Sequence, residues 1–139
     1  MKKLLFILVL FMSLDLKAQD RVIPDKDDVP NCKLMSGGKY INMETDDRVT
    51  SGYHAIIKDG VEIEYVDDGK YYLKSTLDFK DKCSYKITIE ECTIPGFVFQ
   101  KGDIIYSEIV ETSTKHNLIK IKSKPENGPW VIVVFRKIE

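Results

Sequence analysis

Hydrophobic and polar residues alternate through much of the chain. Val61, Ile63 and Tyr65 alternate with Glu62 and Glu64. The same period of two recurs in three further stretches, 70–79, 84–92 and 116–123. Alternation of this kind places one face of a strand in a core and the other in water. It therefore predicts half-buried antiparallel strands, with both glutamates on the solvent side.

Turn signals separate these stretches. Asp59-Gly60 and Asp68-Gly69 are dipeptides favoured in tight hairpins, where the backbone needs positive φ. Together with later turns they divide the chain into eight predicted strands, at 37–44, 48–57, 61–66, 70–79, 84–92, 103–111, 116–123 and 130–138. Outside the first 18 residues no stretch has a convincing helical stripe, so we expect an all-β domain.

The short connections predict an antiparallel up-and-down meander, because strands joined by tight turns pair with each other. An open meander would leave an unpaired edge at each end, and closure into a barrel removes both edges. The last strand is apolar from Trp130 to Phe135, which suits a strand covered on both faces. We therefore favour a single small barrel of about eight strands over a sandwich.

The N-terminal residues have the pattern of an export signal. Lys2 and Lys3 precede an apolar run from Leu4 to Leu14, and a short polar end leads to Ala18. The run is too short to span a membrane, which takes about 20 apolar residues, so we predict a signal peptide over 1–18. Residues 19–31 contain two prolines and four aspartates and predict a flexible arm before a barrel domain at 32–139.

Charge restricts the kinds of partner. Residues 1–18 hold three of the 21 basic and one of the 22 acidic residues, so their removal brings the net charge to −3. No basic block occurs, whereas nucleic-acid binding depends on a basic patch, and we expect no nucleic-acid partner. No second apolar stretch of 18 residues follows, so no transmembrane segment is expected after signal removal.

Three cysteines, Cys32, Cys83 and Cys92, follow the predicted signal. In an oxidising compartment two of them should pair. If 83–92 is one strand, its ends lie about 30 Å apart, whereas bonded cysteines need Cα atoms within about 7 Å. Cys32 is therefore expected to bond either Cys83 or Cys92. No spacing typical of a metal site occurs, and we predict no metal and no cofactor.

Enzymatic motifs are absent from the sequence. Neither His54 nor His116 lies near a serine in a nucleophile elbow, and no phosphate-binding glycine motif occurs. A glycosidase needs two carboxylates that face each other across a cleft, which the predicted solvent-facing positions of Glu62 and Glu64 exclude. The paired aspartates fit turns better than a calcium loop. We therefore predict a protein that is not an enzyme.

An eight-stranded barrel can be filled by side chains or can hold one small ligand, and the sequence leaves both open. The candidate ligand-binding residues are aromatic residues of the alternating face, Tyr65, Tyr71 and Tyr85. Arg136 in the last strand is a fourth candidate, because an inward guanidinium can pair with a ligand carboxylate. Facing outward, the same side chain would simply be hydrated.

From Cys32 to about Ile138 the chain resembles a group of small exported proteins of Bacteroidota-type bacteria. The matching pieces, after that cysteine, are Gly38-Lys39-Tyr40, Asp68-Gly69-Lys70-Tyr71-Tyr72-Leu73-Lys74-Ser75, Asp81-Lys82-Cys83-Ser84-Tyr85 and Lys101-Gly102-Asp103. The group is similar to lipocalin-related or half-barrel β proteins, although Tyr40 stands where a lipocalin has tryptophan. Its members pair a cysteine before the first strand with the one in the D-x-C-x-Y piece. The resemblance thus implies a Cys32–Cys83 disulfide, with Cys92 left over.

The resemblance implies function only in outline, because the group has no assigned biochemical role. Some members carry a DNA topoisomerase IV label, which does not fit an acidic, exported chain without an ATP-binding motif. We expect a periplasmic or secreted lipocalin-like barrel that binds a small apolar ligand or a protein partner. The alternative is a structural or inhibitory interaction module whose core is filled.

Overall fold

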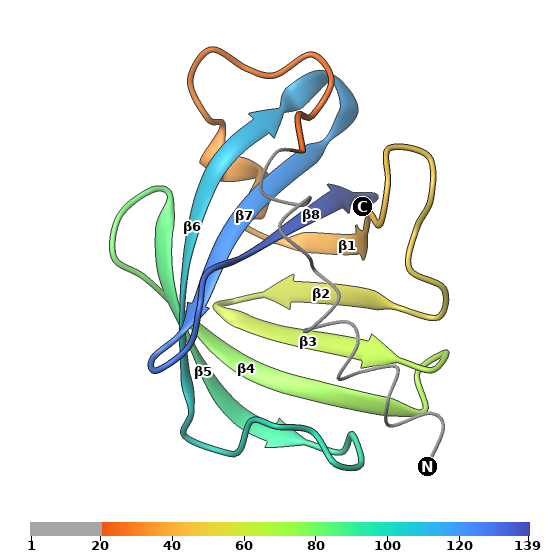
Figure 1. Ribbon diagram of the computed structural model, residues 1–139, viewed down its shortest axis with the longest axis vertical. Coiled ribbons are helices and arrows are strands. Elements are labelled where there is room, and N and C mark those ends of the chain that lie inside the picture. The colour runs from red at the N-terminus through yellow and green to blue at the C-terminus, as the bar shows by residue number, and fades with distance from the viewer. Residues whose placement is uncertain (1–20) are drawn as a thin grey trace.

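Eight antiparallel strands form an up-and-down meander that closes into a barrel, because β1 pairs with β8 as well as with β2 (Figure 1). The computed structural model describes residues 21–139, so the predicted signal peptide lies outside the described residues. The strands are β1 (Gly38–Asn42), β2 (His54–Lys58), β3 (Val61–Val66), β4 (Tyr71–Phe79), β5 (Ser84–Cys92), β6 (Ile104–Ser113), β7 (Leu118–Pro125) and β8 (Val131–Lys137). The predicted all-β meander and its closure are confirmed.

The remaining elements are short. A 3-10 helix, η2 (Cys32–Met35), precedes β1, and a second, η3 (Thr114–His116), connects β6 to β7. The largest difference from the predicted strands is in β2, which begins at His54 rather than at 48, because residues 43–53 form a loop in which Met43 and Val49 make only an isolated bridge. No helix among residues 21–139 is long and apolar enough to cross a membrane.

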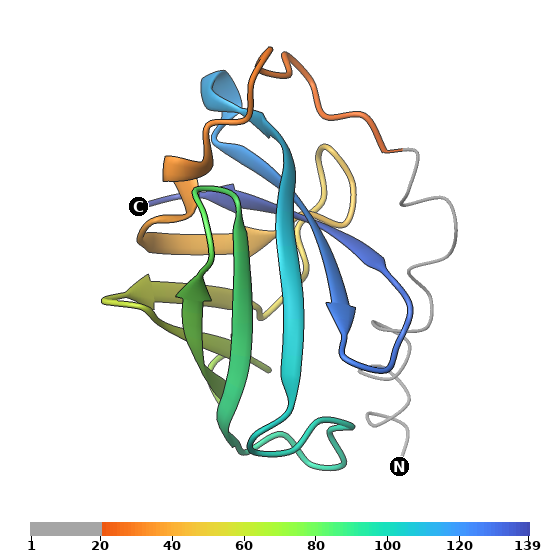
Figure 2. The same cartoon turned by 90° about the vertical axis from the view of Figure 1, so that its left-hand side faces the viewer.

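The barrel has two ends of different character. The first, here the disulfide end, carries η2 and the turns that join β2 to β3, β4 to β5 and β6 to β7. The second, here the loop end, carries the loops at 43–53 and 93–103 and the turns at 67–70 and 126–130. Figure 2 shows the long strands β5 and β6 running between the two ends.

The disulfide end is closed by the main core. Cys32 is bonded to Cys83, with their Cα atoms 5.3 Å apart, while Cys92 is free. The pairing that the resemblance implies is thus confirmed. The bond fixes η2 across the opening, where Met35 is only 1% exposed. The core beneath it includes Tyr40, Ala55, Ile57, Leu77, Tyr85, Ile109, Ile119, Ile121 and Phe135.

Alternation predicts the two faces of β4 correctly. Leu73 and Leu77 point inward and are buried, whereas Thr76 is exposed and Lys74 is partly exposed. Because a shift of one residue would expose every inward side chain, the two leucines fix the register of this strand. Tyr71, also on the inward face, is partly buried and packs against a second cluster around Leu73, Ile89 and Ile94 at the loop end.

The described part of the N-terminal arm lies packed along the outside of the barrel. Ile23 is 1% exposed and contacts Met43, Leu118 and Val134 on the outer face. Lys120 donates a hydrogen bond to the Arg21 carbonyl oxygen at 2.6 Å. The expectation of a flexible arm therefore does not describe residues 21–31, because this segment covers an apolar strip on the outer face of β7 and β8.

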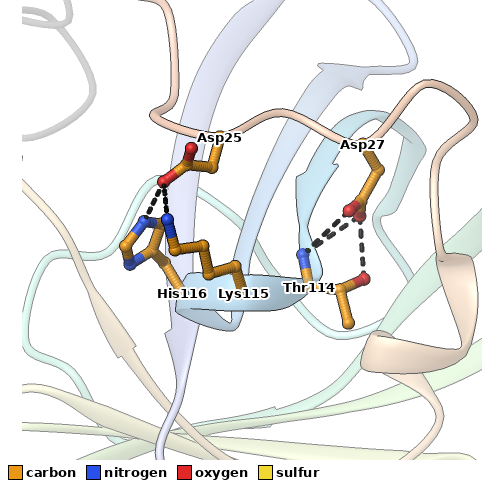
Figure 3. A network of polar contacts seen from close by, with 5 residues as sticks. All are labelled: Asp25, Asp27, Thr114, Lys115 and His116. Carbon is orange, nitrogen blue, oxygen red and sulfur yellow. Dashed lines mark hydrogen bonds and ion pairs between the residues drawn. The ribbon is translucent and has the colours of Figure 1, made fainter.

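Aspartates attach the arm to the connection between β6 and β7. The Asp27 carboxylate accepts hydrogen bonds from the Thr112 hydroxyl at 2.5 Å and from the Thr114 amide at 3.1 Å. Asp25 lies 2.9 Å from the Lys115 ammonium and 2.6 Å from Nε2 of His116. Figure 3 shows both carboxylates pointing from the arm toward η3. Asp25 and Asp27, which were among the aspartates that predicted a flexible arm, thus attach the arm to the barrel.

Candidate functional site: an acidic pair inside the barrel

Glu62 and Glu64 point into the barrel, so the prediction that they face solvent is wrong. In the β2–β3 hairpin, Ile57 lies opposite Glu62 and Ala55 lies opposite Glu64. Directly opposed residues project from the same face of a sheet. Ile57 and Ala55 belong to the core at 3% and 1% exposure, and Glu62 itself is 4% exposed. Glu64 follows two residues later on the same face and is partly buried.

The turn explains why alternation assigned the wrong face. Asp59 and Gly60 form a two-residue connection, which places Lys58 directly opposite Val61. Since Lys58 is exposed on the outer face, Val61 lies there too, followed by Ile63 and Tyr65. The outer positions are partly covered by neighbours; Tyr65, for example, stacks on His54 with ring centroids 4.8 Å apart. The alternation of apolar and polar residues predicted the strand correctly, but it did not determine which of the two faces points into the barrel.

Three tyrosines surround the acidic pair, and their hydroxyl groups are already in use. The Tyr40 hydroxyl donates to the carbonyl oxygens of Leu34 and Gly37, at 2.8 and 2.9 Å. Tyr85 is hydrogen-bonded to Ser107, and the Tyr53 hydroxyl is hydrogen-bonded to Glu64. Glu64 therefore has one phenolic partner.

Glu62 lacks such a partner. None of the hydrogen bonds or ion pairs in the described chain involves its carboxylate. The residue opposite it on β4 is Ser75, which is 2% exposed. A carboxyl group with so little access to water, and without a cation or a donor beside it, is costly in its ionised form.

Burial raises the pKa values of both carboxyl groups. Loss of hydration raises the pKa of Glu62 well above its usual value, and the charge of Glu64 adds to the effect. Burial likewise raises the pKa of Glu64 to about 7, against a lowering by the hydrogen bond from Tyr53. Burial also raises the pKa of Tyr40 to about 12. At neutral pH the two carboxyl groups therefore titrate as a coupled pair that holds protons.

On the β7 and β8 side of the barrel, the inward side chains become less buried toward the loop end. From the buried Tyr85, directly opposed residues lead around the barrel through Ser107 and Ser123 to Val131. Ser107 is buried and its hydroxyl lies 2.7 Å from that of Ser123, whereas Ser123 and Val131 are only partly buried. This wall combines hydroxyl groups with aliphatic surface, in contrast to the closed disulfide end.

The structure separates the four residues that the sequence proposed for ligand binding. Tyr85 is an interior residue, 3% exposed, beside the acidic pair. Tyr71 faces inward but packs in the loop-end cluster, with the Lys70 ammonium 5.1 Å from its ring centroid. Tyr65 is on the outer face, so its expected inward position is wrong. Arg136 is also on the outer face, since it follows the inward Phe135 and lies opposite Leu118 of the outer cluster.

Sequence reasoning missed Glu62, Glu64 and Tyr53, and one signal could have found the first two. A two-residue Asp-Gly turn pairs the residues that flank it, here Lys58 and Val61. Placing the lysine in water would have placed Val61 beside it and turned the glutamates inward. Tyr53 offered no comparable signal, because it precedes β2 in the loop and reaches the pair only through the closed fold.

The comparisons with known proteins add no relative: no family model, curated protein or solved structure matches the chain. The described residues also contain no group of three or more histidine, cysteine, aspartate or glutamate side chains that could hold a metal ion. Fold and site together define a small closed antiparallel β-barrel with an acidic interior. Chemically, such an interior can accept hydrogen bonds, exchange protons near neutral pH and attract a positive group.

Proposed function

We propose that this protein is an exported, non-enzymatic binding protein that holds a small, largely apolar molecule inside its barrel. The observation that carries the proposal is the change in burial along the β7 and β8 side of the interior, from a core sealed by η2 to partly buried inward residues such as Ser123 and Val131. Binding sites in small barrels combine apolar walls with a few polar groups that orient the ligand. The interior of this barrel has both.

The proposed location outside the cytoplasm has support from the disulfide. Structural disulfides persist in oxidising compartments such as the periplasm or the extracellular space. The Cys32–Cys83 bond holds η2 over one end of the barrel. A periplasmic or secreted, lipocalin-like protein remains the proposal that best fits this bond and the predicted signal over residues 1–18.

A second candidate function, protein interaction, has one observation in its favour. Because the glutamates of β3 face inward, its apolar residues form a row on the outer face, where Ile56 of β2 is 38% exposed opposite Ile63. Exposed apolar surface on a sheet can be an interaction site. The row is narrow and interrupted by Lys58, so we place interior binding first.

Substitutions on two adjacent residues of β8 test the proposed function. Val131 points inward and Ile132 outward, and both are partly buried. We expect the neutral fluorescent probe N-phenyl-1-naphthylamine to bind the wild-type protein and to be displaced by n-octanol. Val131→Trp should weaken probe binding at least about tenfold by filling the interior, whereas Ile132→Trp should leave it within about twofold. Circular dichroism checks that both variants fold.

Two results would overturn interior binding. One is absence of probe binding to the wild-type protein. The other is an equal effect of the two tryptophan substitutions, which would place the probe on the outer surface and favour the interaction module.

A further inference from the structure

The acidic pair lacks a compensating positive charge. The pKa values of Glu62 and Glu64 are raised by burial, and no lysine or arginine of the described chain acts on either carboxyl group to lower them. Buried carboxylates in proteins are ordinarily paired with a cation or with several hydrogen-bond donors. Glu62 is 4% exposed and has neither.

Rearrangement of the nearby hydroxyl groups would not satisfy Glu62 without cost. Tyr40 is committed to two carbonyl oxygens that hold η2 against β1, and Tyr85 and Ser107 form part of a chain that continues to Ser123. Tyr53 already serves Glu64. A group that fits here therefore brings its own donors and its own positive charge.

We propose that Glu62 and Glu64 together bind the ammonium group of an amphiphilic organic amine, whose apolar part lies along the interior wall toward Ser123 and Val131. The inference rests on the proposed function and names the class of ligand. An ammonium group has three donors and one positive charge, which match two carboxylates and the adjacent hydroxyl of Ser75.

The chemistry favours an ammonium over a metal ion. Calcium takes six to eight oxygen ligands, and magnesium requires near-octahedral coordination. The pair provides two carboxylates, and no group of three metal-binding side chains exists among the described residues. An alkylammonium needs fewer ligands and gains further stabilisation from burial of its chain.

Protons compete with such a ligand. The groups that face the pair are Tyr40 from β1, Tyr53 from the 43–53 loop, Ser75 from β4, Tyr85 from β5 and Ser107 from β6. The tyrosines stay neutral throughout the neutral range, because burial raises their pKa values further. The titration that changes binding between pH 5 and 8 is therefore that of the two carboxyl groups, which release protons as the ammonium enters.

Displacement of N-phenyl-1-naphthylamine by three eight-carbon compounds tests the inference on the full mature chain. The compounds are n-octylammonium, n-octanol and octanoate, which differ only in the head group. We expect octylammonium to bind at least about tenfold more tightly than octanol at pH 7.5, and octanoate to bind most weakly. The affinity for octylammonium should rise from pH 5.5 to 8, while that for octanol should not change.

Two matched variants locate the effect. Glu62→Gln should abolish the preference for octylammonium over octanol without weakening octanol. Glu108→Gln makes the same change in charge on the outer face, where Glu108 pairs with Lys122 at 3.1 Å, and should retain the preference. Calorimetry in two buffers of different ionisation enthalpy should show proton release with octylammonium alone.

The outcomes separate this inference from the proposed function. If octanol binds as tightly as octylammonium, or if Glu62→Gln keeps the preference, interior binding stands and ammonium recognition is overturned. If neither compound displaces the probe, both are overturned. If the calcium ion, added as calcium chloride, binds more tightly than octylammonium, the proposed amine ligand is overturned and the acidic pair is assigned to a metal ion.

Discussion

Glu62 and Glu64 lie in the barrel interior, unlike the surface carboxylates of residues 21–139 that pair with lysine. The partly exposed Glu108 and the exposed Asp78 keep their carboxylates at the surface, next to lysine side chains. The interior pair is enclosed by tyrosines and by core residues such as Ile57. The physical consequence is that folding favours protonation of the pair, since the protonated forms lose least on leaving water.

The stability of the protein should therefore fall as pH rises. In the unfolded chain both carboxyl groups ionise near pH 4.3, whereas in the folded chain burial raises the pKa of Glu64 to about 7 and that of Glu62 well above its usual value. The folded state thus binds more protons between these values, and the free energy of unfolding decreases with pH across this window. Urea denaturation at pH 5, 6, 7 and 8 measures the effect.

Removal of one ionisable group should flatten this dependence. Glu62→Gln is expected to raise the free energy of unfolding at pH 8 by at least about 1.4 kcal/mol, the equivalent of one pKa unit, and to change it less at pH 5. Glu108→Gln serves as the control and should follow the wild-type curve. Parallel curves for wild type and Glu62→Gln would contradict the assignment of the pair as a buried, protonated site.

At the scale of elements, the arm and the β6–β7 connection are joined by a small set of polar contacts. Asp27 accepts a backbone hydrogen bond as well as hydroxyl bonds, and these donors lower the pKa of its carboxyl group. The stabilisation they give is present above the usual pKa of an aspartate and is lost as pH falls through the lowered value. Lys115 and His116 similarly lower the pKa of Asp25.

Loss of the Asp27 carboxylate should loosen the arm without unfolding the barrel. Asp27→Ala removes the acceptor for Thr112 and Thr114, so we expect the Asn31 amide, now bonded to the Thr112 hydroxyl at 2.7 Å, to exchange at least about tenfold faster. Hydrogen exchange followed by NMR at neutral pH measures this rate. Asp28→Ala, at an exposed neighbour, is the control, and equal effects of the two variants would show that Asp27 does not attach the arm.

At the scale of the whole molecule, the disulfide links η2, which closes the disulfide end of the barrel, to the β4–β5 hairpin. It joins residues 51 positions apart, and a loop of this length contributes about 4 kcal/mol to stability by restricting the unfolded chain. Removal of the bond should also free η2 from the disulfide end, where Met35 and Tyr40 are buried.

The double substitution Cys32→Ser with Cys83→Ser should therefore lower the free energy of unfolding by about 3–4 kcal/mol in chemical denaturation. Cys92→Ser is the matched control, because Cys92 is free and only partly buried, and it should change stability by less than about 1 kcal/mol. An equally large loss of stability for Cys92→Ser, or no loss for the double substitution, would show that the disulfide does not stabilise the protein as proposed.

The strands, their order and the closure of the barrel were predictable from the chain alone. Period-two alternation and Asp-Gly turns are local properties, and short connections leave neighbouring strands little choice but to pair. They gave the limits of β3 and β5 and the faces of β4 correctly. The choice of Cys83 as the partner of Cys32 came from resemblance, because strand geometry alone left Cys92 equally open.

The assignment of side chains to the inside of the barrel depends on strand pairing and distant contacts as well as on the alternating pattern. A strand with residues suitable for either face has two assignments of similar local energy, and for β3 the pairing of Lys58 with Val61 and of Ile57 with Glu62 selects the one that buries glutamate. The attachment of residues 21–31 to the outer face likewise depends on partners about 85 positions away in the sequence, such as Thr112 for Asp27. Contacts at that separation leave no periodic trace in the chain, so they become visible only once the barrel has closed.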